Sequence, residues 1–191
     1  MGFLLAGGKS SRMGENKAFL DFGGQTLLAR GLVELGSACD RVAIVGDPAI
    51  FASFGPVVED VFAGCGPLAG IHAALTHSSA ELNLMLAVDM PFVTRQLLSF
   101  LFDVASKGDA VITVPRTPRG LQPLCAVYRR DFAVVTERSL KEGRYKVDAA
   151  FAGLQLRVID EPELVRSGFP EKSFFNLNTP QERQDAEDLT F

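Results

Sequence analysis

The feature that most constrains the fold of this chain is an alternation of two kinds of segment. Short, nearly continuous apolar runs are separated by longer segments of helical periodicity. The apolar runs cover residues 3–6, 41–46, 82–88 and 110–114. They lack the alternation of polar and apolar residues, which is typical of strands buried on both faces. Because they alternate with helical segments, the sequence predicts an α/β fold with a mainly parallel sheet between two layers of helices.

The segments between these runs place apolar side chains on one side of a helix. Residues 26–38, 67–76 and 94–106 have apolar residues three and four positions apart, the repeat of an amphipathic helix. Thr94 is expected to cap the third of these helices. The second half is less regular. There we predict two strands and two helices, at residues 124–128, 155–159, 131–142 and 180–189, the last with a proline in its first turn.

A chain of 191 residues with 47% apolar and 22% charged residues suits one globular domain, and no linker or repeat divides residues 1–191. No apolar stretch is long enough to span a bilayer, and no basic leader precedes the apolar start. We therefore expect a cytoplasmic protein without a membrane contact. Three widely spaced cysteines form no zinc or disulfide pattern, so free thiols are expected.

The net charge of −4 argues against sequence-independent binding of nucleic acid. A nucleotide can still bind where positive charge is concentrated, and the first predicted strand leads to such a place. Gly7 and Gly8 follow this strand, and Lys9, Arg12 and Lys17 come next. Glycines let the backbone approach a ligand closely, and the cations suit phosphate oxygens. In an open α/β sheet this loop lies at the carboxyl end of a strand, where ligands bind.

The loop is neither of the two common phosphate-binding motifs. No Gly-Lys-Ser/Thr follows at the spacing of a P-loop, and the adjacent glycines do not spell the dinucleotide-binding fingerprint. A basic surface loop without a ligand is the alternative, and the three cations after the glycine pair count against it.

Two aspartates follow other apolar segments. Asp89 comes directly after residues 82–88, and Asp60 ends the run at residues 57–60. Mg²⁺ prefers oxygen ligands and commonly takes one or two carboxylates together with substrate phosphates. Asp89 is therefore the candidate magnesium ligand, although an aspartate in this place can also cap a helix. Residues 64–70 form a Gly-rich loop that leads into a helix. The small side chains of this loop leave room for a flat base, but the segment can equally be a tight loop without a ligand.

Four segments stand in the order of a known family and extend over almost the whole chain. They read Leu-Ala-Gly-Gly-x-Ser-x-Arg-Met-Gly-x-x-Lys at residues 5–17, Gly-Pro-Leu-Ala-Gly at 66–70, Asp-Met-Pro at 89–91 and Asn-Leu-Asn-Thr-Pro at 176–180. In these segments the chain resembles the molybdenum cofactor guanylyltransferase family. The first segment also occurs in the wider group of sugar-phosphate and cofactor nucleotidyltransferases, so it indicates the reaction more firmly than the substrate.

The resemblance implies a single-domain, Rossmann-like three-layer sandwich whose N-terminal half binds nucleotide and whose C-terminal half binds pterin. It implies an enzyme with Mg²⁺ as cofactor that transfers GMP from GTP to molybdopterin, releases pyrophosphate and forms molybdopterin guanine dinucleotide. It also implies transient contacts with proteins that deliver and accept the cofactor.

Site residues follow from the resemblance position by position. The residues expected to bind GTP are Leu5, Ala6, Gly7, Gly8, Lys17, Asp60 and Asp89. The expected catalytic residues are Arg12, Lys17 and Asp89: the two cations and the glycine N–H groups hold the leaving pyrophosphate, and Asp89 binds Mg²⁺. After the second strand, the best-known members of the family have an Asn that helps to bind GTP. This chain has Val-Gly-Asp there, at residues 45–47.

The pterin side is predicted from polar groups of the second half. The candidates are Gln122, Arg144, Lys146, Asn176 and Asn178. The two asparagines are two positions apart, so in an extended segment they share a face, and they are the better candidates for pterin or a second metal contact. For each candidate alone, a structural role is equally open.

No general base is required, because the attacking phosphate is ionised near neutral pH. His72 and His77 are accordingly expected on a helix surface. Two other functions stay open. The first is transfer of CMP from CTP, but that branch typically reads Leu-Ala-Ala-Gly, and Gly7 favours GTP. The second is a non-catalytic nucleotide-binding protein, against which Arg12, Lys17 and Asp89 together argue.

Overall fold

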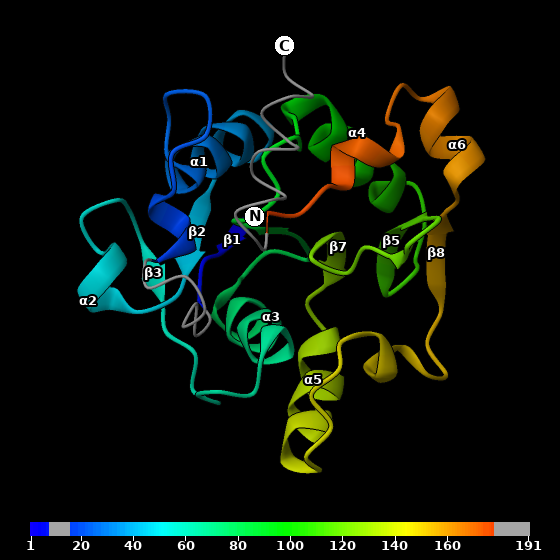
Figure 1. Cartoon of the computed structure of the whole chain (residues 1–191). Coiled ribbons are helices and arrows are strands. Elements are labelled where there is room, and N and C mark those ends of the chain that lie inside the picture. The colour runs from blue at the N-terminus through cyan, green and yellow to red at the C-terminus, as the bar shows by residue number, and fades with distance from the viewer. Residues whose placement is uncertain (8–15, 178–191) are drawn as a thin grey trace.

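The predicted strands join in one mixed sheet in the computed structural model, which describes residues 1–7 and 16–177 (Figure 1). The strands are β1 (Gly2–Leu5), β2 (Val42–Val45), β3 (Val57–Val58), β4 (Leu82–Ala87), β5 (Ile112–Thr117), β6 (Gly120–Leu121), β7 (Cys125–Arg129) and β8 (Leu156–Ile159). Their order is β3-β2-β1-β4-β7-β5-β6, and β8 also pairs with β5.

Most neighbouring strands run parallel, as the sequence predicted. β1 lies between β2 and β4, so Leu5 pairs with Val45 on one side and with Ala87 on the other. β2 continues to β3, and β8 is parallel to β5. The exceptions are β6, which is antiparallel to β5, and β7, which runs antiparallel to both β4 and β5. β7 follows the short β5–β6 turn, and a connection this short can join only antiparallel strands.

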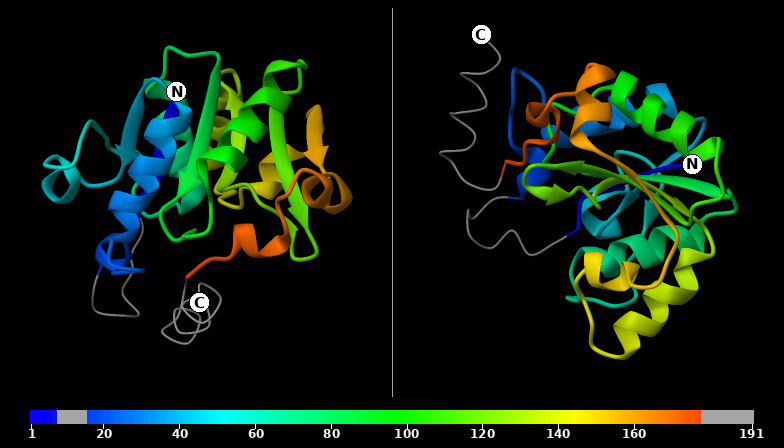
Figure 2. Two further views of the ribbon diagram at one scale, coloured as in Figure 1. Left: turned by 90° about the horizontal axis from the view of Figure 1, so that it is seen from above. Right: turned by 90° about the vertical axis from the view of Figure 1, so that its right-hand side faces the viewer.

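Helices cover both faces of the sheet (Figure 2). The α-helices are α1 (Leu27–Ala38), α2 (Pro48–Phe51), α3 (Pro67–His77), α4 (Arg95–Ser106), α5 (Phe132–Lys141) and α6 (Glu161–Arg166). The 3₁₀ helices are η1 (Lys17–Phe19), η2 (Asp148–Phe151) and η3 (Glu171–Phe174). α1 and α4 pack on one face, and α3 and α5 pack on the other, so a three-layer sandwich is confirmed.

Successive residues of β1 explain why its apolar run is continuous. Phe3 belongs to the apolar cluster on the α3 and α5 side, and Leu4 belongs to the cluster on the α1 and α4 side. Both side chains are fully buried. The predicted cap of α4 is also confirmed, since Thr94 Oγ1 accepts a hydrogen bond from Leu97 N at 3.4 Å.

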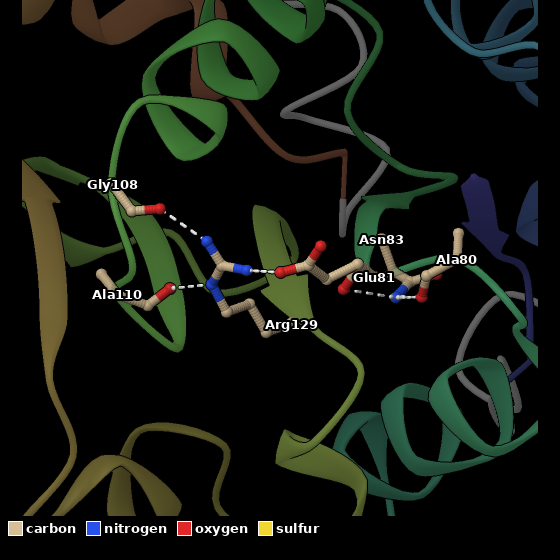
Figure 3. Close-up of polar contacts among 6 residues, drawn as sticks. All are labelled: Ala80, Glu81, Asn83, Gly108, Ala110 and Arg129. Atoms are coloured by element: carbon tan, nitrogen blue, oxygen red, sulfur yellow. Dashed lines mark hydrogen bonds and ion pairs between the residues drawn. The ribbon is translucent and has the colours of Figure 1, made fainter.

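Arg129, at the end of β7, ties together three segments at the amino ends of the parallel strands (Figure 3). Its guanidinium donates to the Ala110 carbonyl at 3.2 Å and to the Gly108 carbonyl at 2.5 Å, and it pairs with Glu81. Glu81 comes just before β4, and Gly108 and Ala110 come just before β5. The side chain thereby holds the antiparallel strand between its two neighbours.

Several elements differ from the sequence-based expectation. α2 and α6 are not predicted, because helices of four and six residues are too short to show a periodic pattern. β5 extends to Thr117, beyond the predicted end at residue 114. The helix predicted over residues 180–189 lies outside the described residues. The three cysteines are free thiols, as expected. No helix of the described residues is long and apolar enough to cross a membrane.

Candidate functional site

The residues predicted to bind nucleotide lie where parallel strands end. Leu5 ends β1, Asp60 stands two residues after β3, and Asp89 stands two residues after β4. In the strand order β3-β2-β1-β4, the two aspartates flank the end of β1 on opposite sides. Neighbouring strands are about 4.8 Å apart, so β3 and β4 are separated by roughly 14 Å. The two carboxylates are therefore placed to contact different parts of one long ligand.

Gly7 has no structural reason among the described residues to be a glycine. Its φ is not positive, whereas Gly64 and Gly66 have φ values of 79° and 75° that favour glycine. A Cβ at position 7 would lie 3.6 Å from Gly46 Cα and from the Val45 carbonyl oxygen, which is ordinary contact. Gly7 is also exposed. A bare backbone at this edge suits a ligand that approaches closely.

The N–H group of Gly7 is not available for a phosphate in this structure. The N–H groups of Ala6 and Gly7 both donate to the Val45 carbonyl, each at 3.0 Å. In this conformation the end of β1 keeps its bonds to β2, and the role of the Gly7 N–H in holding pyrophosphate stays a prediction. Gly8 and Arg12 lie outside the described residues, and their predicted roles stay predictions.

Lys17 and Asp89 meet at this edge. Lys17 Nζ lies 3.3 Å from Asp89 Oδ2, and the two side chains are 20% and 21% exposed. Lys17 begins η1, which is capped by Asn16 through a 3.1 Å bond from Ala18 N to the Asn16 side chain. The structure thus brings together two residues that are far apart in the sequence and that were both predicted to be catalytic.

The backbone at Asp89 is fixed by two other segments. Leu177 N donates to the Asp89 carbonyl at 2.8 Å, and Val88 N donates to the Leu5 carbonyl at 3.1 Å. Leu177 is buried in a small apolar cluster with Leu20, which follows η1. The C-terminal motif therefore begins beside the predicted metal ligand, with η1 and η3 at the same edge of the sheet (Figure 2).

Asp60 and the Gly-rich segment lie on the other side of β1. Asp60 is partly exposed, and its Oδ1 accepts a 2.8 Å bond from Phe62 N. α3 begins after Gly66 with Pro67 in its first turn, as predicted. Because Gly64 and Gly66 have positive φ values, backbone conformation alone accounts for these two glycines.

Structural roles account for Val-Gly-Asp at residues 45–47, where the family resemblance expects an Asn. A Cβ at Gly46 would lie 2.8 Å from the ring of Phe51, which packs directly over this position. Asp47 caps α2, with its side chain accepting a 2.8 Å bond from Ala49 N. The Val45 carbonyl is engaged with the end of β1. The packing of α2 therefore leaves no room for a larger residue at position 46.

His72 is buried, so the prediction of a surface position is wrong for it, while His77 is exposed as predicted. α5 packs against α3 on the same face of the sheet, and this covers the His72 side of the helix. The ring meets Phe62 edge-on at 5.1 Å between centroids, and Nδ1 has no hydrogen-bond partner. Burial lowers the pKa of His72, against the opposing effect of Glu137 and Asp60.

Gln122 lines a pocket of about 200 Å³ on the far side of Asp89 from Asp60. The pocket is formed by residues after β5 and from η3: Thr117, Arg119, Gln122, Glu171, Lys172, Phe174 and Phe175. The Gln122 amide donates to Thr117 Oγ1 at 3.0 Å. Arg119 pairs with Glu171 at 3.0 Å, and its guanidinium lies 5.6 Å from the centre of the Phe175 ring.

The structure separates the residues predicted to bind pterin. Asn176 directly follows Phe175 of this pocket, so Gln122 and Asn176 belong to one region. Arg144 is exposed after α5 and pairs with Glu142. Its neighbour Tyr145 lies beside Cys65 of the Gly-rich segment, and a hydrogen bond with that thiol raises the pKa of Tyr145. Arg144 and Lys146 are thus placed on the α3 and α5 side, and Asn178 lies outside the described residues.

Of the seven residues that line the pocket, only Gln122 is among the sequence-based predictions. Arg119, Lys172 and Phe175 show no motif, and the first is more than fifty residues away from the other two along the chain. Only the return of the chain through η3 to the end of β5 brings them together. The signal that tertiary structure adds is a pair of cationic side chains, Arg119 and Lys172, beside the one carboxylate of Glu171.

Comparisons with known proteins identify the family of the domain. Residues 2–156 match the family described as MobA-like NTP transferase domain. The molybdenum cofactor guanylyltransferase of Desulfosudis oleivorans is 36% identical, over 97% of this chain and 93% of that protein. The probable molybdenum cofactor guanylyltransferase of Clostridium perfringens is 33% identical, over 95% and 93%.

Solved structures have the same fold. Molybdopterin-guanine dinucleotide biosynthesis protein A from Archaeoglobus fulgidus superposes with a TM-score of 0.87 at 27% identity, over 99% of this chain and 97% of that one. A 2-C-methyl-D-erythritol 4-phosphate cytidylyltransferase from Thermus thermophilus, 21% identical, reaches 0.73 over 98% and 97%. The sequence relatives and the shared domain show that the chain belongs to the molybdenum cofactor guanylyltransferase family.

Proposed function

We propose that this chain transfers GMP from GTP to molybdopterin, with Mg²⁺ bound at Asp89. Relatives at 33% and 36% identity over nearly the whole chain carry the name of this activity. The observation that carries the proposal is the arrangement at the carboxyl edge. There the bare backbone of Gly7 lies between Asp60 on one side and the Lys17–Asp89 pair on the other.

The donor set at Asp89 fits a magnesium ion. Its carboxylate is partly exposed at the edge where the phosphates would lie, and its backbone is held by Leu177. Mg²⁺ commonly binds through one or two carboxylates and completes its octahedron with phosphates and water. When bound there, the ion would neutralise the phosphate charge that develops during transfer.

The reaction is an in-line displacement. An oxygen of the terminal phosphate of molybdopterin forms a bond to the α-phosphorus of GTP, the bond from that phosphorus to the bridging oxygen breaks, and pyrophosphate leaves. Such a transfer needs mainly positioning and charge neutralisation. Lys17 would bind the oxygens of the leaving pyrophosphate, and the attacking oxygen, which is already ionised, needs no protein base.

The strand order supports an arrangement in which the two substrates approach Asp89 from opposite sides. GTP would lie over the end of β1, with its base toward Asp60 and the Gly-rich segment and its phosphates toward Lys17. The acceptor would enter from the pocket of Arg119 and Gln122, since β5 ends and β7 begins at the same edge as β4. Asp89 lies between these regions, and this supports a position for it beside both phosphate groups.

The acceptor pocket predicts a selective effect of Arg119. Arg119→Gln should raise the KM for molybdopterin about tenfold and leave the KM for GTP unchanged, because it removes one positive charge from the acceptor side only. Both constants are measured by steady-state kinetics with the other substrate saturating. Arg116→Gln is the matched control, since Arg116 is an exposed arginine of β5 outside the pocket lining. Equal changes in both variants would contradict the assignment.

Substitution of Gly7 is expected to change the activity without changing the stability. In Gly7→Ala the new methyl group makes only ordinary contacts with described residues, so the free energy of unfolding should change by less than about 0.5 kcal/mol. The kcat/KM for GTP should fall about tenfold, because the methyl group stands where the backbone would meet the nucleotide. Urea unfolding and kinetics with GTP and CTP measure the two quantities. Undiminished kcat/KM for GTP would remove Gly7 from the nucleotide site.

Product identification tests the proposed function directly. The protein is incubated with molybdopterin, Mg²⁺ and each of the four nucleoside triphosphates, and the products are separated by mass. We expect pyrophosphate and the guanine dinucleotide with GTP. Formation of the cytosine dinucleotide alone would establish the CMP-transfer alternative. Nucleotide binding without any dinucleotide product would establish a non-catalytic protein.

A further inference from the structure

The Lys17–Asp89 ion pair joins two residues that the proposed function assigns to different ligands. Lys17 is assigned to phosphate and Asp89 to the metal ion, yet the Lys17 ammonium lies 3.3 Å from Asp89 Oδ2. The Lys17 ammonium therefore contacts one oxygen of the carboxylate to which the metal ion would bind.

The two positive charges cannot share this carboxylate without repulsion. A divalent ion bound to Asp89 would lie within a few ångströms of the ammonium, where the Coulomb repulsion between cations is strong. Both side chains are about four-fifths buried, so salt and water screen this repulsion less than on an open surface. The ammonium in its present position therefore weakens the binding of a metal ion to this carboxylate.

The backbones of Lys17 and Asp89 are both anchored, whereas the stem of the lysine side chain is flexible. Lys17 is anchored at the start of η1 by the Asn16 cap and by the bond from Leu20 N to its carbonyl at 3.1 Å. The Asp89 carbonyl is held by Leu177 N. Lysine has a flexible four-carbon stem, so its ammonium can turn from the carboxylate to a phosphate without a change in either backbone.

We infer that Lys17 and a divalent cation compete for the Asp89 carboxylate, so that Asp89 binds metal tightly only when nucleotide phosphates hold the lysine. This inference rests on the proposed function for the assignment of Asp89 to the metal. It makes metal and nucleotide binding positively coupled. By linkage, each ligand raises the affinity for the other by the same factor.

The inference is tested by Mn²⁺ binding to the full chain without added nucleotide. Free Mn²⁺ is counted by its paramagnetic resonance signal, so the readout does not depend on activity. Lys17→Met, which keeps an unbranched side chain one atom shorter and removes the charge, should bind Mn²⁺ about tenfold more tightly than the parent protein. Lys17→Arg, which keeps the charge, should stay close to the parent.

A matched control removes another lysine from another carboxylate. Lys107 pairs with Asp103 at 2.5 Å at the end of α4, and both side chains are exposed. Lys107→Met changes the net charge by the same amount and frees an aspartate, but it should leave Mn²⁺ binding unchanged. Equal Mn²⁺ affinity of the parent and Lys17→Met would overturn the competition, as would an equal gain in Lys107→Met.

The double variant separates this inference from the proposed function. Lys17→Met/Asp89→Asn should lose the tight Mn²⁺ binding of Lys17→Met, because the freed carboxylate is gone. If the double variant keeps it, the metal binds elsewhere, and the assignment of Asp89 in the proposed function fails as well. If the parent already binds Mn²⁺ tightly and Asp89→Asn abolishes this, Asp89 keeps its assignment and only the competition with Lys17 is wrong.

Discussion

Asp89→Ala is expected to lower the rate of GMP transfer about 100- to 1000-fold while the protein stays folded. The substitution removes the proposed magnesium ligand, which is also the partner of Lys17, at the proposed meeting point of the two substrates. Its side chain is partly exposed and belongs to neither large apolar cluster, so the core is untouched. The bond from Leu177 N goes to the backbone carbonyl and is kept.

The rate is measured as product formed under saturating GTP and molybdopterin, and folding is followed by thermal unfolding. Asp131→Ala is the matched control, because Asp131 is exposed just before α5 and its side chain makes no cap. That variant should transfer GMP at the parent rate. Parent-level transfer by Asp89→Ala would remove the residue from its role. A large drop in its unfolding temperature would instead give the carboxylate a structural role.

Phe51→Ala is expected to lower the free energy of unfolding by about 3–4 kcal/mol. The Phe51 ring is 1% exposed, packs in the cluster on the α1 and α4 side and lies over Gly46. It also stacks on Phe19 of η1 at 5.9 Å between ring centres. Removal of the ring leaves a cavity between the end of β2 and η1. The sheet keeps the residues around this cavity in place.

Phe54→Ala is the control for this loss. Phe54 also contacts Phe19, at 5.6 Å, but 48% of its surface is exposed. Its removal should cost about 1 kcal/mol or less, because little apolar surface leaves water there on folding. Urea unfolding of both variants gives the two values through the shift of the midpoint at constant slope. Equal losses would show that α2 closes over the cavity, and Gly46 would then lose its packing explanation.

Local pattern was enough to predict the main elements. The continuous apolar runs at β1, β2 and β4 predict strands buried on both faces, because such residues are stable only where both sides are covered. The periodicity of α1, α3 and α4, together with the Thr94 cap of α4, predicts helices close to their observed ends. Parallel strands end at one edge, so the placement of Gly7, Asp60 and Asp89 there also followed from the sequence.

Other features depend on which segments become neighbours. The direction of β7 cannot be inferred from its apolar residues, because parallel and antiparallel buried strands show the same pattern. The burial of His72 depends on α5, which packs over α3 from sixty residues further along the chain. The 3.0 Å bond of the Gly7 N–H to β2 follows from strand pairing that a loop motif does not specify.

The sequence by itself determined the strand-and-helix order and the chemistry available after β1, β3 and β4, because periodicity, glycines and caps act over a few residues. Tertiary structure alone decided that Lys17 meets Asp89 and that Arg119 and Lys172 line one pocket. These contacts join residues more than fifty positions apart. They exist only because the buried sheet fixes where its surrounding segments return.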